Sequence, residues 1–306
     1  MRIFEFKSIV ILIIVPLLFF YSCDNSETIF EEDNLVTGTG FFSYNEYSPF
    51  SGKPINCYYH IPEGVDEQAP ILVILPGAGR EGKDLRSDLI NQSDLLGFIV
   101  LSISFPDAYF PGSDVYNLAN IFKDGDHPTN ETLNPTDVWT FSVLNPLFEA
   151  FKKRVGNKST TYDLFGHSAG AQLLHRYLIF QPNNKVNRVV ISAAGWYNLP
   201  DATIDFPYGL KLSPAETTDM SLVFSKKVFI IVGSDDTDPN SFNLRHTNQA
   251  DLQGNTRLDR AQYFYSTCYD LAKQQEASFN WEYNLVPNTG HESDKMAVFG
   301  SNILYR

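Results

Sequence analysis

One serine of this chain lies between two glycines, in a setting where its hydroxyl could act as a nucleophile. Segment 166–170 reads Gly-His-Ser-Ala-Gly, a G-x-S-x-G pattern centred on Ser168. A short apolar run precedes it, and residues 171–180 carry apolar side chains at helical spacing. A sharp strand-to-helix turn exposes such a serine at the sheet edge, and the free N–H groups of the helix start favour developing negative charge. The pattern predicts a catalytic nucleophile; the alternative is a chance match in an ordinary turn.

A serine hydroxyl is a poor nucleophile near neutral pH, so a neighbouring imidazole must take its proton. His291 follows the last predicted strand, which makes it the first candidate for this base and for the acid that later protonates the leaving group. His246 is the fallback. The other histidines have different predicted places: packed in strand 55–61 (His60), inside the serine turn and pointing away from the site (His167), on the following helix (His175) and in an acidic loop (His127).

Three carboxylates follow the predicted strand 228–232, and one of them could orient the imidazole. Asp235 and Asp236 are adjacent, so they face different ways if the chain stays extended there. Asp238 precedes Pro239, which biases it towards an extended turn conformation in which it could brace the loop. The same loop also imitates the first half of a calcium site, but Ser241 and Thr247 stand where glycine and glutamate are needed.

Metal and disulfide chemistry receive little support from the sequence. Cys57 and Cys268 are too far apart for any short metal-ligand spacing. We therefore expect neither a metal site nor a cofactor. An exported protein could form a disulfide between these two cysteines, and the sequence leaves their pairing open.

The elements that must position these side chains follow from the apolar pattern. Strands are predicted in segments 55–61, 71–75, 97–105, 161–166, 188–192, 228–232 and 280–286, and helices in 144–155, 171–180 and 260–275. Strands that alternate with helices or long crossovers indicate a mainly parallel central sheet with helices on both faces. Ligands bind such sheets at the carboxyl ends of the strands. Ser168, the aspartate cluster and His291 all directly follow predicted strands.

This order of serine, aspartate and histidine resembles the α/β-hydrolase superfamily, over residues 54–295. The loops are similar to those of secreted bacterial esterases and polyester-depolymerase-like serine hydrolases. The resemblance implies the α/β-hydrolase fold and cleavage of carboxylic esters through an acyl-enzyme. It also implies Asp236 as the acid, because related esterases place it three residues beyond the glycine that ends this strand, here Gly233.

Two backbone amides are expected to bind the oxyanion of the tetrahedral intermediate. Ala169 follows the nucleophile and is the first. The resemblance implies a second donor in segment 76–79, for which Ala78 is the choice; Pro76 stands where relatives often have histidine.

Two other functions stay open: a serine peptidase on the same fold, and a non-catalytic surface lipoprotein that binds glycans. Aromatic side chains near the predicted site could stack on sugars or aryl esters, or could simply pack; they are Phe105, Tyr109, Phe110, Trp196, Tyr197 and Tyr208. The expected substrate is a small-molecule or glycan-linked ester.

The 306-residue chain carries a formal net charge of −13, which argues against nucleic acid or anionic lipid as a partner. Residues 1–22 have the charged start and apolar run of an export signal. The junction before Cys23 resembles that of a bacterial lipoprotein, which implies lipidation of Cys23 and a place in the cell envelope. An ordinary signal peptide and an uncleaved anchor are the alternatives. Residues 23–34 read as an acidic tether and 35–306 as one catalytic domain, with the lipid as the only membrane contact.

Overall fold

A single eight-stranded sheet forms the centre of the computed structural model, which describes residues 35–306. Its strand order is β1-β2-β4-β3-β5-β6-β7-β8. The strands from β3 to β8 are parallel, and the antiparallel β1 and β2 form one end. The predicted, mainly parallel sheet is therefore confirmed. The strands are β1 Gly38–Tyr44, β2 Ile55–Ile61, β3 Ile71–Leu75, β4 Ile99–Ser104, β5 Tyr162–His167, β6 Val186–Ser192, β7 Lys227–Gly233 and β8 Trp281–Val286.

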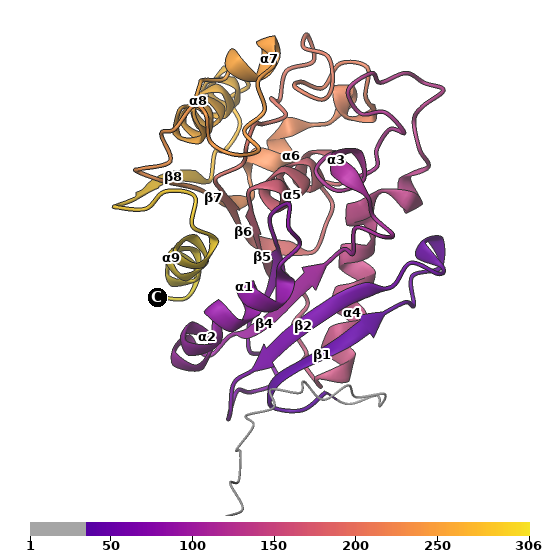
Figure 1. Cartoon of the computed structure of the whole chain (residues 1–306), viewed down its shortest axis with the longest axis vertical. Coiled ribbons are helices and arrows are strands. Elements are labelled where there is room, and N and C mark those ends of the chain that lie inside the picture. Colours follow the sequence, from indigo (N-terminus) through magenta and orange to yellow (C-terminus); the bar gives the residue numbers. More distant parts are fainter. Residues whose placement is uncertain (1–34) are drawn as a thin grey trace, which may run out of the picture.

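Helices cover both faces of this sheet (Figure 1). Helix α9 packs on β5, β6 and β7 beside α1 and α2, while α5 packs on β3, β5 and β6 and α8 on β7 and β8. The helices are α1 Gly82–Asp88, α2 Ile90–Leu96, α3 Gly112–Val115, α4 Leu144–Arg154, α5 Ala169–Phe180, α6 Met220–Phe224, α7 Asn248–Asp251, α8 Arg257–Gln274 and α9 Ser293–Tyr305. Short 3₁₀ turns lie at Ser48–Phe50, Thr136–Val138, Thr140–Val143 and Pro214–Thr217.

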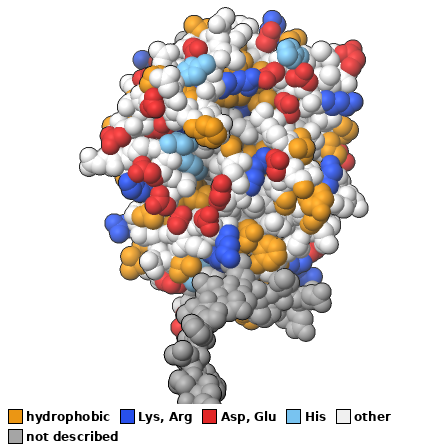
Figure 2. Space-filling model, in the orientation of Figure 1, with side chains coloured by type: hydrophobic (Ala, Val, Ile, Leu, Met, Phe, Trp, Pro, Cys, Tyr) orange, Lys and Arg blue, Asp and Glu red, His pale blue; other side chains and the backbone are white. Residues whose placement is uncertain are grey.

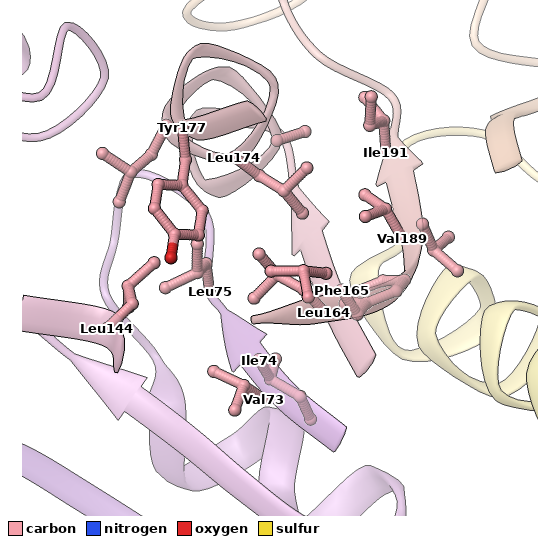
Figure 3. Close-up of a cluster of buried hydrophobic side chains, with 14 of the residues drawn as sticks. Val73, Ile74, Leu75, Leu144, Leu164, Phe165, Leu174, Tyr177, Val189 and Ile191 are labelled. Carbon is pink, nitrogen blue, oxygen red and sulfur yellow. The ribbon is translucent and has the colours of Figure 1, made fainter. Parts of the chain in front are cut away.

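The central strands are apolar because both of their faces are covered. All five residues of β3 are buried, as the continuous apolar run predicts. Figure 3 shows Leu174 and Tyr177 of α5 above the strands that carry Leu75 and Leu164. Each fully buried aliphatic side chain contributes about 1.5–3 kcal/mol of transfer free energy. This packing makes the sheet a rigid base for the loops at its carboxyl end.

Two glycines let helix α5 begin directly beside the end of β3. A Cβ on Gly170 would lie 2.1 Å from the Leu75 carbonyl oxygen, and one on Gly166 would lie 2.6 Å from the Gly170 oxygen. Neither distance leaves room for a methyl group, so glycine is required at both positions. The close approach places Ser168 against the loop that follows β3.

A third glycine brings the loop after β8 against the end of β7. A Cβ on Gly233 would lie 2.1 Å from the Thr289 carbonyl oxygen. The Asp235 amide donates a hydrogen bond to that same oxygen at 2.8 Å. The segments that carry Asp236 and His291 are thereby held side by side.

Some features differ from the sequence-based expectations. Neither the edge strand β1 nor helix α9 was predicted. Cys57 on β2 and Cys268 on α8 are buried free thiols.

The predicted signal segment, Cys23 and the tether lie outside the described residues. Within residues 35–306, no helix has the length and apolar character needed to cross a membrane.

Candidate active site

Ser168 occupies a strained backbone conformation at the junction of β5 and α5. Its φ of 53° and ψ of −112° lie outside the regions that non-glycine residues ordinarily adopt. The Ser168 amide donates to the Ser192 carbonyl at 2.9 Å, and the Ser168 carbonyl accepts from the Gln172 amide at 3.1 Å. Such strain costs about 1–3 kcal/mol and persists only where the surroundings enforce it. Here the hydrogen bonds and the flanking glycines enforce it.

His291 and Asp236 form a hydrogen-bonded pair at the carboxyl ends of β8 and β7. His291 Nδ1 lies 2.8 Å from Asp236 Oδ2. The carboxylate side chain is 3% exposed, whereas the imidazole is 27% exposed. With Nδ1–H donating to the carboxylate, Nε2 is left as the proton acceptor. This is the tautomer that a general base beside a serine requires.

Arg257, at the start of α8, compensates the buried charge of Asp236. Its Nη1 lies 3.4 Å from Asp236 Oδ1, and only 2% of the arginine side chain is exposed. The same guanidinium donates to Ser241 Oγ at 2.6 Å and to the Phe242 carbonyl at 3.0 Å. Sequence reasoning missed Arg257. The Thr256–Asp259 capping box, which fixes the start of α8, was the available signal.

Ser168 and His291 line one cavity of about 320 Å³. Gly77 and Ala78 of the loop after β3 contribute to its wall, and Phe242, 87% exposed, stands at its edge. In the described part of the chain, no hydrogen bond joins the Ser168 hydroxyl to His291. Catalytic hydrogen bonds often form only when substrate is bound. The cavity therefore brings together Ser168, His291 and Ala78 of the predicted site.

The two amides predicted to bind an oxyanion are free to do so. Within residues 35–306, neither the Ala78 nor the Ala169 amide has a hydrogen-bond acceptor. A Cβ built on Gly77 would lie 3.7 Å from Ser168 Cβ, so this loop reaches the serine. The Tyr116 hydroxyl donates to the Pro76 carbonyl at 2.6 Å, which holds this loop in place.

His167 does not point away from the site, so that expectation was wrong. It lines the cavity, and its ring centroid lies 4.6 Å from that of His291. His167 Nδ1 lies 3.0 Å from Ser192 Oγ. Burial lowers the pKa of His167 well below its usual range, and the neighbouring His291 and Arg257 lower it further. His167 therefore stays neutral and supports the His291 ring by contact.

The remaining histidines have partners away from the serine. His60 Nε2 on β2 lies 2.7 Å from Asp94 Oδ1. His175 donates from Nδ1 to the Ala171 carbonyl at 2.9 Å and accepts from the Asn198 amide at 2.9 Å, both inside the core. The two ring nitrogens of His246 lie within hydrogen-bond distance of the Asp251 carboxylate and the Pro239 carbonyl oxygen. Exposed His127 pairs with Asp124. Among the described residues, His291 is the one histidine that combines a buried carboxylate with a place beside Ser168.

The neighbouring aspartates have other partners. Asp235 Oδ1 accepts from the Ser234 hydroxyl at 2.8 Å. Asp238 Oδ1 accepts from the Asn240 amide at 2.8 Å, which braces the loop. The structure brings Asp236, and neither neighbour, to His291.

Solved structures provide the comparisons, because no family model and no curated protein matches the chain. Poly(aspartic acid) hydrolase-1 from Sphingomonas sp. KT-1 is 31% identical, with a TM-score of 0.82 over 89% of this chain and 100% of that one. LpqC, a poly(3-hydroxybutyrate) depolymerase from Bordetella parapertussis, is 24% identical, with a TM-score of 0.80 over 88% of this chain and 90% of that one. An S-formylglutathione hydrolase from Agrobacterium tumefaciens shares the fold, with 13% identity and a TM-score of 0.55 over 89% and 95% of the two chains.

These similarities show that the chain belongs to the α/β-hydrolase superfamily. Within it, the chain resembles esterases and polymer-degrading serine hydrolases, and it is a hydrolase.

Replacing Asp236 by Asn should lower kcat by up to about 10⁴-fold, because the amide neither holds the Nδ1–H tautomer nor stabilises an imidazolium. Asp235→Asn is the matched control, since the Asp235 carboxylate accepts from Ser234 in its own loop and the substitution keeps the backbone amide. Hydrolysis of 4-nitrophenyl acetate and the melting temperature are measured for both variants. Near-normal kcat in folded Asp236→Asn would contradict the assignment.

Proposed function

We propose that this protein is a serine hydrolase that cleaves carboxylic esters through an acyl-enzyme intermediate. The observation that supports this most is the hydrogen bond between buried Asp236 and His291, whose imidazole lines the same cavity as Ser168. The strained serine and two free amides beside it add the other parts that acyl transfer needs.

The proposed reaction uses these groups in order. Ser168 Oγ attacks the ester carbonyl carbon while its proton moves to His291 Nε2. The carbonyl oxygen becomes an oxyanion and accepts from the Ala78 and Ala169 amides, each such donor being worth about 2.7–4 kcal/mol in the barrier. His291 then protonates the departing alcohol. In the second half, His291 takes a proton from water, the resulting hydroxide attacks the acyl carbon, and Ser168 leaves with that proton.

A second candidate is amide hydrolysis by the same groups. The 31% identical neighbour is named for poly(aspartic acid), a polymer whose units are joined by amide bonds. Measuring the rates of hydrolysis of an ester and of the amide of the same acyl group would distinguish ester hydrolysis from amide hydrolysis. An ester-only enzyme leaves the amide intact.

The non-catalytic glycan-binding alternative has less support. Phe105, Phe110 and Tyr197 are at most 2% exposed, and the rings of Trp196 and Tyr208 pack against each other, tilted by 42° with their centroids 4.7 Å apart. Of the six aromatic residues considered for sugar stacking, Tyr109 alone is substantially exposed, at 41%. These rings mainly pack the loops.

We further propose export to the bacterial cell envelope with a lipid on Cys23, on the basis of the charged start, the apolar run and the Ser22–Cys23 junction. Cys23→Ser should release the protein from membranes and abolish palmitate incorporation. Retention of residues 1–22 by a mutant that stays membrane-bound, as shown by intact mass, would indicate a plain anchor instead.

A fluorophosphonate probe tests the nucleophile. It should label the wild-type protein and leave Ser168→Ala unlabelled, because the probe captures activated serine hydroxyls. Ser142→Ala is a control, since that serine hydroxyl donates to the Thr136 carbonyl, accepts from the Gln181 side chain and does not line the cavity of Ser168. Equal labelling of wild type and Ser168→Ala would rule out Ser168.

A further inference from the structure

A second cavity, of about 370 Å³, adjoins the one that holds Ser168. The two cavities share Ala78 and Asn243 in their walls. His291 lines the first cavity and does not line the second. A substrate whose carbonyl oxygen reaches the Ala78 amide can therefore extend into either space.

The two spaces would receive different parts of a substrate. His291 must protonate the leaving group, so the leaving group occupies the first cavity, beside the imidazole. The carbonyl group sits at Ser168 and Ala78. The rest of the acyl group then extends past Ala78 into the second cavity.

Arg80 lines the second cavity, and one of its nitrogens lacks a hydrogen-bond partner in the described chain. Its side chain is only 9% exposed, and its Nη1 is buried without a hydrogen-bond acceptor in the described chain. The other nitrogens hold the group in place: Nε donates to the Ala78 carbonyl at 3.3 Å and Nη2 to the Phe110 carbonyl at 3.4 Å. The guanidinium lies 3.5 Å from the centroid of the Tyr116 ring. A fixed, buried donor thus remains unused.

The charges around Arg80 are incompletely balanced. Its nearest carboxylate, Asp107, is 3.8 Å away and 76% exposed, so this pair is weak. Burial lowers the pKa of Arg80 from its usual value, because the nearby acidic groups offset only part of the lost hydration. Arg245 lines the same cavity but is paired with Asp126.

Arg176 adds positive charge behind the wall. It is fully buried and has no carboxylate partner in residues 35–306. Burial and then the neighbouring Arg245 lower its pKa to about 9. In the wall itself, Arg80 and Arg245 outnumber the one carboxylate, Asp107, so the second cavity is locally positive in a protein of net charge −13.

The first cavity, in contrast, carries acidic side chains in its wall. Glu81 and Asp84 lie in its wall, near the space assigned to the leaving group. On the face shown in Figure 2, Lys and Arg are scattered among acidic side chains and form no extended basic surface. A long polyanion would meet repulsion at Glu81 and Asp84, whereas one anionic group could reach Arg80.

We propose that the second cavity binds a carboxylate at the far end of the acyl group, with Arg80 as the specificity-determining residue. The favoured substrate is then an ester of a dicarboxylic acid with a neutral alcohol. This inference rests on the proposed function and specifies its substrate class. Charge-assisted hydrogen bonds to the carboxylate should raise kcat/KM by about 10- to 100-fold over an uncharged acyl group.

Two matched esters provide the test: 4-nitrophenyl hydrogen adipate, which ends in a carboxylate, and 4-nitrophenyl adipamate, which ends in a neutral amide of the same length. Rates are corrected for spontaneous hydrolysis. The wild type should prefer the carboxylate ester by about 10- to 100-fold. Arg80→Met should bring the preference near unity, and Arg80→Lys should retain part of it. Lys273→Met removes a charge from exposed helix surface and should retain it all.

The ratio of the two kcat/KM values separates recognition from loop support. Equal losses on both esters in Arg80→Met would show that Arg80 only holds the Ala78 loop, and would overturn the inference. A wild-type ratio near unity would also overturn it while leaving ester hydrolysis standing. Failure to hydrolyse either ester, together with no fluorophosphonate labelling, would instead remove the proposed function and the inference with it. Cleavage of poly(aspartic acid) faster than of the adipate ester would contradict the single-carboxylate specificity.

Discussion

The contact between the end of β7 and the loop after β8 is the constraint on which the site depends. The Thr289 carbonyl fits against Gly233 because that residue has no Cβ, and it accepts the Asp235 amide at 2.8 Å. This approach sets the separation of the two segments that carry the acid and the base. The 2.8 Å bond between Asp236 and His291 follows from it.

A second close approach, between the start of α5 and the end of β3, sets the position of Ser168. Gly170 lies against the Leu75 carbonyl, so Ser168 emerges beside Ala78. The site is therefore assembled where two pairs of backbone segments touch without side chains between them. Arg257 then offsets the cost of burying Asp236, since an unpaired carboxylate in the interior would be strongly unfavourable.

Much of this arrangement could be predicted from local sequence. The apolar run 71–75 has the bounds of β3, and the G-x-S-x-G turn lies between β5 and α5 as expected. Features that depend on distant contacts could not be predicted. Arg80 donates a hydrogen bond to the carbonyl of Phe110, which is 30 positions away in the sequence. Arg257 donates one to Asp236, which is 21 positions away. The His167 ring lies 4.6 Å from the His291 ring, a contact between distant parts of the chain that no pattern within the serine turn reveals.

The central claim is that Ser168 and His291 act as one unit, and a double-mutant cycle on kcat tests it most directly. Ser168→Ala, His291→Ala and the double variant are compared on 4-nitrophenyl acetate, with the melting temperature confirming that each is folded. If the two residues form one catalytic device, the double variant should lose no more activity than the worse single variant. Losses that multiply would show that the two side chains act independently, and would contradict the account.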